Sequence, residues 1–123
     1  MKEFRLIGKD IEGSLSPIIH NYIFKLNNIS ARYDIMNITN KKEISNVISM
    51  IRNGKINGLN VTIPYKTYII NNIDKIDNKS KDINAINCIS IDTNKSIKGF
   101  NTDCLGFEKF LRANNIDFKN NDI

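Results

Sequence analysis

Apolar and polar residues alternate along this chain in blocks that predict strands and helices in turn. Short apolar runs and period-2 alternation are typical of strands, whereas apolar residues spaced three and four apart are typical of helices. The predicted strands cover residues 4–8, 31–38, 59–63, 86–91 and 96–100. The predicted helices cover residues 16–26, 41–53, 65–83 (with a break near Asn71 and Asn72) and 103–114.

The clearest helix is 41–53, in which one stripe is apolar (Ile44, Val47, Ile48 and Ile51) and Gly54 follows as a stop signal. The first helix begins at Ser16, an expected N-cap, and Pro17, and its apolar spacing comprises Ile19, Tyr22, Ile23 and Leu26. In the last helix we expect Phe107, Phe110 and Leu111 to face inward.

Strands that alternate with helices predict an α/β fold with a largely parallel sheet covered on both faces. The polar segment 92–95 predicts a turn, so the two strands around it form a hairpin that adds an antiparallel member. We therefore expect a three-layer α/β/α domain with a mostly parallel sheet and one antiparallel strand.

The composition argues against several classes of partner and site. The 123 residues carry a net charge of +5, yet no basic run exceeds two residues and aromatics do not interleave with basic clusters. We therefore interpret the lysines as ordinary solvent-exposed residues, and we expect neither nucleic acid nor membrane as a partner. The chain has one His and two Cys, Cys88 and Cys104, without a metal-ligand spacing, so we expect no metal site, no disulfide scaffold and a cytoplasmic location.

Small polar and charged residues follow several predicted strands at their ends. In open α/β sheets, ligands bind beyond the carboxyl ends of the strands. Such a set of hydroxyls, amides, one amine and one carboxylate suits a small, polyhydroxylated, anionic ligand. Read singly, the same residues have structural explanations: Ser16 and Asp103 as helix caps, Thr62 as a strand residue. The candidates are Ser14, Ser16, Asn60, Thr62, Lys66, Asn87 and Asp103.

Four motifs together resemble the shikimate dehydrogenase family. Residues 6–21 (LIGKDIEGSLSPIIHN) look like its opening signature, and residues 58–66 (GLNVTIPYK) match its G-x-N-V-T-x-P-x-K motif. Residues 85–87 (AIN) and 99–103 (GFNTD) are similar to the two motifs that follow. The chain departs from the usual pattern at Asp10, Gly13, Cys88 and Cys104, none of which replaces a group with a direct chemical role.

The resemblance implies an NADP-dependent oxidoreductase that reduces 3-dehydroshikimate to shikimate, a step of chorismate and aromatic amino acid biosynthesis. It implies Lys66 and Asp103 as catalytic residues, and Ser14, Ser16, Asn60, Thr62, Lys66, Asn87 and Asp103 as substrate-binding residues. No Gly-x-Gly-x-x-Gly run occurs in the chain. We therefore expect residues 1–114 to be the substrate-binding domain and residues 115–123 to begin a linker to an NADP-binding domain that this chain lacks.

The resemblance also leaves alternatives. A quinate or dual quinate/shikimate dehydrogenase would use the same motifs, and a non-catalytic ligand-binding module would keep the pocket without the chemistry. We expect the 123-residue chain alone to be inactive as a dehydrogenase, and to expose a domain-docking face through which it self-associates.

Overall fold

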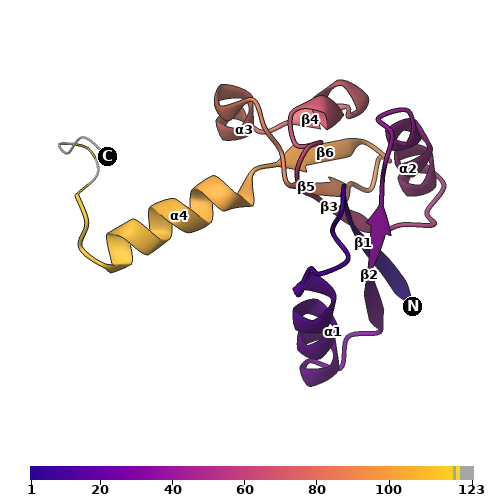
Figure 1. Cartoon of the computed structure of the whole chain (residues 1–123), viewed down its shortest axis with the longest axis horizontal. Helices are drawn as coiled ribbons and strands as arrows, with labels where there is room; N and C mark the ends of the chain where they lie inside the picture. Colours follow the sequence, from indigo (N-terminus) through magenta and orange to yellow (C-terminus); the bar gives the residue numbers. More distant parts are fainter. Residues whose placement is uncertain (118, 120–123) are drawn as a thin grey trace.

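The computed structural model describes residues 1–117 and 119, and it contains one six-stranded sheet with helices packed around it (Figure 1). The strands are β1 (Lys2–Gly8), β2 (Ala31–Asn37), β3 (Gly58–Val61), β4 (Lys75–Ile76), β5 (Cys88–Ile91) and β6 (Ile97–Phe100). The helices are α1 (Ser16–Leu26), α2 (Glu43–Arg52), α3 (Asn78–Ile83) and α4 (Thr102–Ala113), with a 3₁₀ turn, η1 (Tyr68–Asn72).

The strand order is β2-β1-β3-β5-β6-β4, and β5 alone runs against its neighbours. This arrangement confirms the predicted mostly parallel sheet with one antiparallel strand. Because β2 and β3 flank β1 on opposite sides and such crossovers are right-handed, α1 and α2 lie on opposite faces of the sheet. The carboxyl ends of β1 and β3, the end of β6 and the start of β5 meet at one edge.

The main core lies between the sheet and α2. The four predicted apolar residues of α2, Ile44, Val47, Ile48 and Ile51, are all buried and join the largest hydrophobic cluster. The helix ends at Arg52, and Gly54 follows with a φ of 71°, a conformation that glycine adopts without a Cβ penalty. The pattern of this helix was therefore sufficient to predict both its extent and its buried face.

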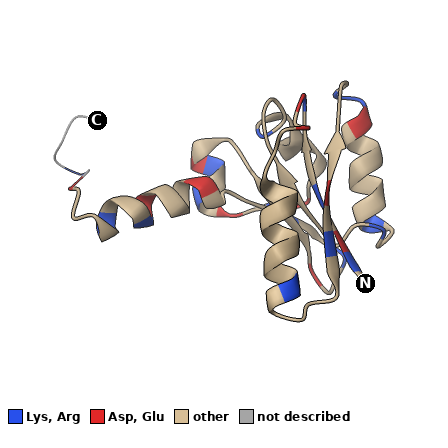
Figure 2. Cartoon of the chain, turned by 60° about the horizontal axis from the view of Figure 1, so that its bottom comes forward, with Lys and Arg blue, Asp and Glu red and all other residues tan. Residues whose placement is uncertain are grey.

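Helix α1 covers the other face and buries none of its residues fully. Beyond Pro17, its half-buried side chains are Ser16, His20 and Phe24, which recur at four-residue intervals and face the sheet. The apolar residues that predicted the helix are exposed instead, and Lys25 is its one charged residue (Figure 2). Ser16 is not the N-cap that we expected: Leu15 holds that position, and the Ser14 hydroxyl accepts the N–H of Ser16 at 3.2 Å.

The prediction of a helix over residues 65–83 is wrong for most of the segment, which forms η1, β4 and α3 in succession, whereas the predicted break near Asn71 and Asn72 falls where η1 ends. Asp74 ends the first piece: its carboxylate pairs with Arg52 and accepts the N–H of Ile97, which brings β4 beside β6. Asp77 then caps α3 by accepting the N–H of Ser80. Bonds from Asp74 and Asp77 to backbone N–H groups, one long-range and one local, thus override the helical spacing of the isoleucines.

The last helix, α4, extends away from the sheet (Figure 1). Leu111 is buried as predicted, but Phe107 and Phe110 are exposed, so their expected inward orientation is wrong. A helix that leaves the body of the fold has no sheet against which to place both aromatic rings. Its N-cap is Asn101, whose side chain accepts the N–H of Cys104, and this leaves Asp103 in the first turn free for another role.

Candidate active site

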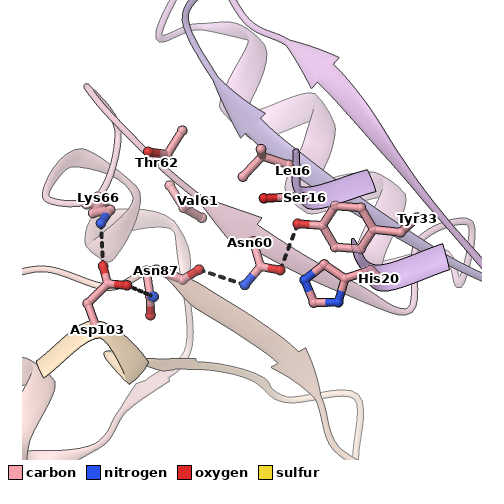
Figure 3. Close-up of a pocket in the computed structure, with 10 residues that line it drawn as sticks. All are labelled: Leu6, Ser16, His20, Tyr33, Asn60, Val61, Thr62, Lys66, Asn87 and Asp103. Carbon is pink, nitrogen blue, oxygen red and sulfur yellow. Dashed lines mark hydrogen bonds and ion pairs between the residues drawn. The ribbon is translucent and has the colours of Figure 1, made fainter. Parts of the chain in front are cut away.

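A pocket of about 220 Å³ opens at the edge of the sheet where β1 and β3 end (Figure 3). Residues from several segments far apart in the sequence line it, which is the placement expected for a ligand site in an open α/β sheet. The lining residues are Leu6, Ser16, His20, Tyr33, Asn60, Val61, Thr62, Lys66, Asn87 and Asp103.

At one end of the pocket, the Lys66 ammonium donates a hydrogen bond to Oδ2 of Asp103 (Figure 3). Lys66 follows β3 in a loop anchored by Tyr65, a buried residue whose hydroxyl donates to the carbonyl of Ile38 at 2.8 Å. The side chains of Lys66 and Asp103 keep 30% and 56% of their accessible surface. Both charges are therefore within reach of a ligand.

Asn87 connects this ion pair to the backbone. It is 8% exposed, and its amide nitrogen donates to Oδ1 of Asp103 at 2.8 Å. Its amide oxygen accepts the N–H of Thr102 at 2.8 Å, within the first turn of α4. Asn87 thus fixes the start of α4 and one oxygen of Asp103, so that the second oxygen faces Lys66.

The opposite wall is formed by Tyr33, Asn60 and His20. The Tyr33 hydroxyl donates to Oδ1 of Asn60 at 2.9 Å, and the imidazole of His20 stacks on the Tyr33 ring at 4.2 Å between centroids. Burial, with a contribution from Cys88, raises the pKa of Tyr33 to about 12, so its hydroxyl stays protonated. Burial lowers the pKa of His20 below 6.5, so the imidazole is neutral at pH 7.

The two serines have different positions. Ser16 lines the pocket from the first turn of α1, whereas Ser14 is not among the lining residues and donates to the Ser16 hydroxyl at 3.2 Å. Thr62 lines the pocket just beyond β3, where its N–H donates to the carbonyl of Ile7 at 2.9 Å. Six of the seven candidates from the sequence therefore line one pocket, with Ser14 bonded to one of them.

Sequence reasoning missed His20 and Tyr33, together with the apolar floor of Leu6 and Val61. A signal existed for His20, which lies one helical turn after Ser16 and so projects from the same side of α1. For Tyr33 the alternation of β2 predicts a sheet face but not the pocket. Only the pairing of β2 with β1, and of β1 with β3, brings Tyr33 to Asn60.

The described residues do not fit a dinucleotide. Dinucleotide folds hold the pyrophosphate on a Gly-x-Gly-x-x-Gly turn between the first strand and helix. Here the turn between β1 and α1 contains one glycine, Gly13, and the Ser14 hydroxyl already accepts the N–H of Ser16. Residues 1–117 and 119 also contain no cluster of three metal-ligating side chains, and none of their helices is long and apolar enough to cross a bilayer.

Chemically, this arrangement can bind a small polar anion and handle one proton. Hydroxyls of Ser16 and Thr62 and amides of Asn60 and Asn87 line the pocket. Groups of these kinds donate to a ligand carboxylate, and they donate to or accept from a ligand hydroxyl. The Lys66 ammonium can stabilise a developing oxyanion and protonate it, while Asp103 orients the ammonium.

Comparison with known proteins gives one consistent result. Residues 6–89 match the model of the family described as shikimate dehydrogenase substrate binding domain. A shikimate dehydrogenase (NADP(+)) of Clostridium perfringens is 41% identical over 121 residues, which are 98% of this chain and 44% of that protein.

Two solved structures share the fold. Shikimate dehydrogenase 1 from Peptoclostridium difficile superposes with a TM-score of 0.85 at 37% identity, covering 95% of this chain and 43% of that one. Shikimate 5-dehydrogenase from Listeria monocytogenes, solved in complex with shikimate and NAD, gives a TM-score of 0.87 at 28% identity, covering 95% and 40%. The chain thus spans less than half the length of these relatives, and it belongs to the shikimate dehydrogenase substrate-binding domain family.

Proposed function

We propose that this chain is the substrate-binding half of an NADP-dependent shikimate dehydrogenase, which reduces 3-dehydroshikimate to shikimate in the route to chorismate and aromatic amino acids. The observation that carries the proposal is the ion pair of Lys66 and Asp103 at the end of a polar pocket. The relatives named above support it, since they are shikimate dehydrogenases and one was solved with shikimate bound.

In this reaction Lys66 is the general acid. Reduction of a ketone builds negative charge on its oxygen, and an ammonium next to that oxygen stabilises the charge and donates the proton. Asp103 orients the ammonium and contacts a ring hydroxyl. Ser16 holds the substrate carboxylate together with Ser14, which lies outside the pocket lining and acts through its bond to the Ser16 hydroxyl. The remaining polar residues bind ring hydroxyls: Asn60, Thr62 and Asn87.

The cofactor part of the proposal assigns NADP to residues outside this chain. In this assignment residues 1–114 form the substrate-binding domain and residues 115–123 begin a linker to an NADP-binding domain. Of that segment, residues 118 and 120–123 lie outside the described residues. In this proposal the 123 residues alone bind and orient the substrate and supply one proton, but they do not turn over substrate. A cytoplasmic location is also proposed, supported by the two unpaired cysteines, Cys88 and Cys104.

A last part of the proposal is self-association through the outer faces of α1 and α4. The supporting observation is exposed apolar surface on both helices: Ile18, Ile19, Tyr22 and Leu26 on α1, and Phe107 and Phe110 on α4. Several exposed apolar side chains on one helix face are typical of an interaction face.

Calorimetry of the 123-residue chain tests the main proposal. We expect weak binding of shikimate, weaker binding of quinate, and no turnover of shikimate with NADP. Lys66→Ala should reduce the affinity for shikimate, whereas Lys25→Ala, at the far end of α1, should leave it unchanged. Preferential binding of quinate would favour the quinate dehydrogenase alternative.

Failure to bind either compound would overturn the proposal. Turnover by the chain alone would overturn the assignment of NADP to residues outside it. Binding with the same affinity in the Lys66→Ala variant and the wild type would remove Lys66 from the substrate-binding residues and leave it only the role of general acid.

A further inference from the structure

We propose that Tyr33 is a positioning residue, whose hydroxyl fixes the side-chain amide of Asn60 in the pocket. This inference rests on the proposed function for the identity of the ligand, but not for the geometry. Three side chains carry it: Tyr33 on β2, Asn60 on β3 and His20 on α1 (Figure 3).

The orientation of the Asn60 amide follows from its two partners. At one end it bonds to the backbone carbonyl of Asn87 at 3.1 Å, and a carbonyl oxygen can only accept. The nitrogen Nδ2 must therefore point to Asn87, which leaves Oδ1 to face the Tyr33 hydroxyl as an acceptor at 2.9 Å. One bond would fix one end of the amide, whereas two bonds fix its plane.

With both ends held, Asn60 keeps one N–H and one oxygen lone pair for a ligand. An amide that offers one donor and one acceptor is suited to bridge hydroxyl groups of a polyhydroxylated ring. If the hydroxyl of Tyr33 is removed, the amide can rotate about its remaining bond, and its donor and acceptor lose their fixed direction. Tyr33 thus acts on the ligand through Asn60.

Tyr33 is itself held by two residues of α1, His20 and Asn21. Its side chain is almost fully buried at 4% exposure, and the His20 ring lies nearly parallel to it, at 15°. The amide of Asn21 accepts the backbone N–H of Tyr33 at 2.9 Å and donates to its carbonyl at 2.7 Å. Helix α1 thereby fixes both the ring and the backbone of Tyr33. Because its pKa is raised to about 12, the hydroxyl remains a donor at every pH at which the site would work.

The contact also joins the two walls of the pocket. Hydrogen bonds run from Tyr33 to Asn60, from Asn60 to the backbone of Asn87, and from the side chain of Asn87 to Asp103. A purely structural tyrosine in this place would need only its ring, which packs against His20. The hydroxyl is the group that reaches Asn60, and so a substitution that removes it alone separates the two roles.

The test uses Tyr33→Phe, which keeps the ring, with Tyr22→Phe on the exposed side of α1 as the matched control. The first readout is the side-chain amide signal of Asn60 in the ¹⁵N–¹H spectrum of the free chain. We expect it to shift and broaden in Tyr33→Phe and to stay unchanged in Tyr22→Phe, with the backbone spectrum of both variants folded. An unchanged Asn60 signal in Tyr33→Phe would overturn the inference without any ligand.

The second readout is the dissociation constant for shikimate. We expect it to rise about 5- to 10-fold in Tyr33→Phe, the usual effect of one lost hydrogen bond. In an Asn60→Ala background, Tyr33→Phe should add little, because residues that act as one unit are not additive. Equal effects of Tyr33→Phe in both backgrounds would overturn the positioning role. If the wild-type chain binds no shikimate, the proposed function fails, and the Asn60 signal still decides the inference.

Discussion

Helices α1 and α2 carry similar apolar patterns, but the structure uses them in opposite ways. On α2 the four residues of the stripe are buried in the main core, with Ile44 and Ile51 at 0% exposure. On α1 the corresponding apolar residues remain 44–62% exposed, and the half-buried positions include Ser16, His20 and Phe24. Apolar spacing therefore predicts that a helix forms, but it does not predict what covers that face. On α1 the side that faces the sheet carries Ser16 and His20, and these two residues line the pocket.

The largest expected contrast between the two helices is in stability. Ile51→Ala on α2 should lower the free energy of unfolding by about 2–5 kcal/mol, because it removes buried methylenes and leaves a cavity. Ile19→Ala on α1 makes the same chemical change at a residue that is 53% exposed, and should change stability by no more than about 0.5 kcal/mol.

Urea unfolding followed by circular dichroism measures both variants. At a concentration where the chain is monomeric, a loss of more than about 1 kcal/mol in Ile19→Ala would mean that other parts of the same chain cover the outer face of α1, and the contrast between the two helices would fail.

The second expected contrast is in self-association. Ile18→Lys, at a residue of α1 that is 69% exposed, should weaken association at least about tenfold, since a charge replaces apolar contact surface. Ile83→Lys makes the same change at an exposed residue of α3 and should leave association unaltered.

Light scattering over a range of concentrations measures the average mass against the 14.1 kDa of one chain. A wild-type protein that stays at this mass throughout the range would refute association through α1 and α4.

The smallest expected effect concerns pH. His20 has a pKa below 6.5 in the folded chain, so as pH falls through 6.5 the unfolded chain takes up this proton first. The folded state then loses stability until the pH falls below the folded pKa, whereas above 6.5 the residue contributes no pH dependence. Between about pH 7.5 and 5.5, the wild type should lose more stability than His20→Gln, whose side chain does not titrate.

Chemical denaturation of both proteins at the two pH values measures this difference. An equal pH dependence in wild type and His20→Gln would show that the stacked imidazole takes up its proton as easily in the folded chain as in the unfolded one.

Much of the fold could be predicted where local pattern and tertiary packing agree. The stripe of α2 and the hairpin of β5 and β6 are examples, because each pattern has a sheet or partner strand next to it in sequence. The segment 65–83 could not be predicted, since Asp74 and Asp77 act there through bonds to the backbone, and one of these bonds joins a residue more than twenty positions away.

Some residues of the candidate site could likewise be predicted from the sequence, and others could not. Lys66 and Asp103 could be predicted as neighbours, because each follows a strand that ends at the same edge, and the structure confirms that they are paired. Tyr33 could not be predicted, because its place in the pocket depends on the order β2-β1-β3 and on the depth to which its ring reaches. His20 could not be predicted for the same reason, because the side of α1 that carries it is recognised as the inner side only when the position of the sheet is known.

The hydrogen bonds of Asn21 also affect the exposed edge of the sheet. β2 is an edge strand, and unpaired backbone groups on such a strand invite another chain to add to the sheet. The Asn21 amide occupies the outward N–H and carbonyl of Tyr33, and Asp34 occupies the N–H of Ile35 at 2.9 Å. A strand from another chain would have to displace α1 before it could pair with β2. Asn21, which holds the backbone of Tyr33, therefore also protects this edge of the sheet from fibril-like aggregation.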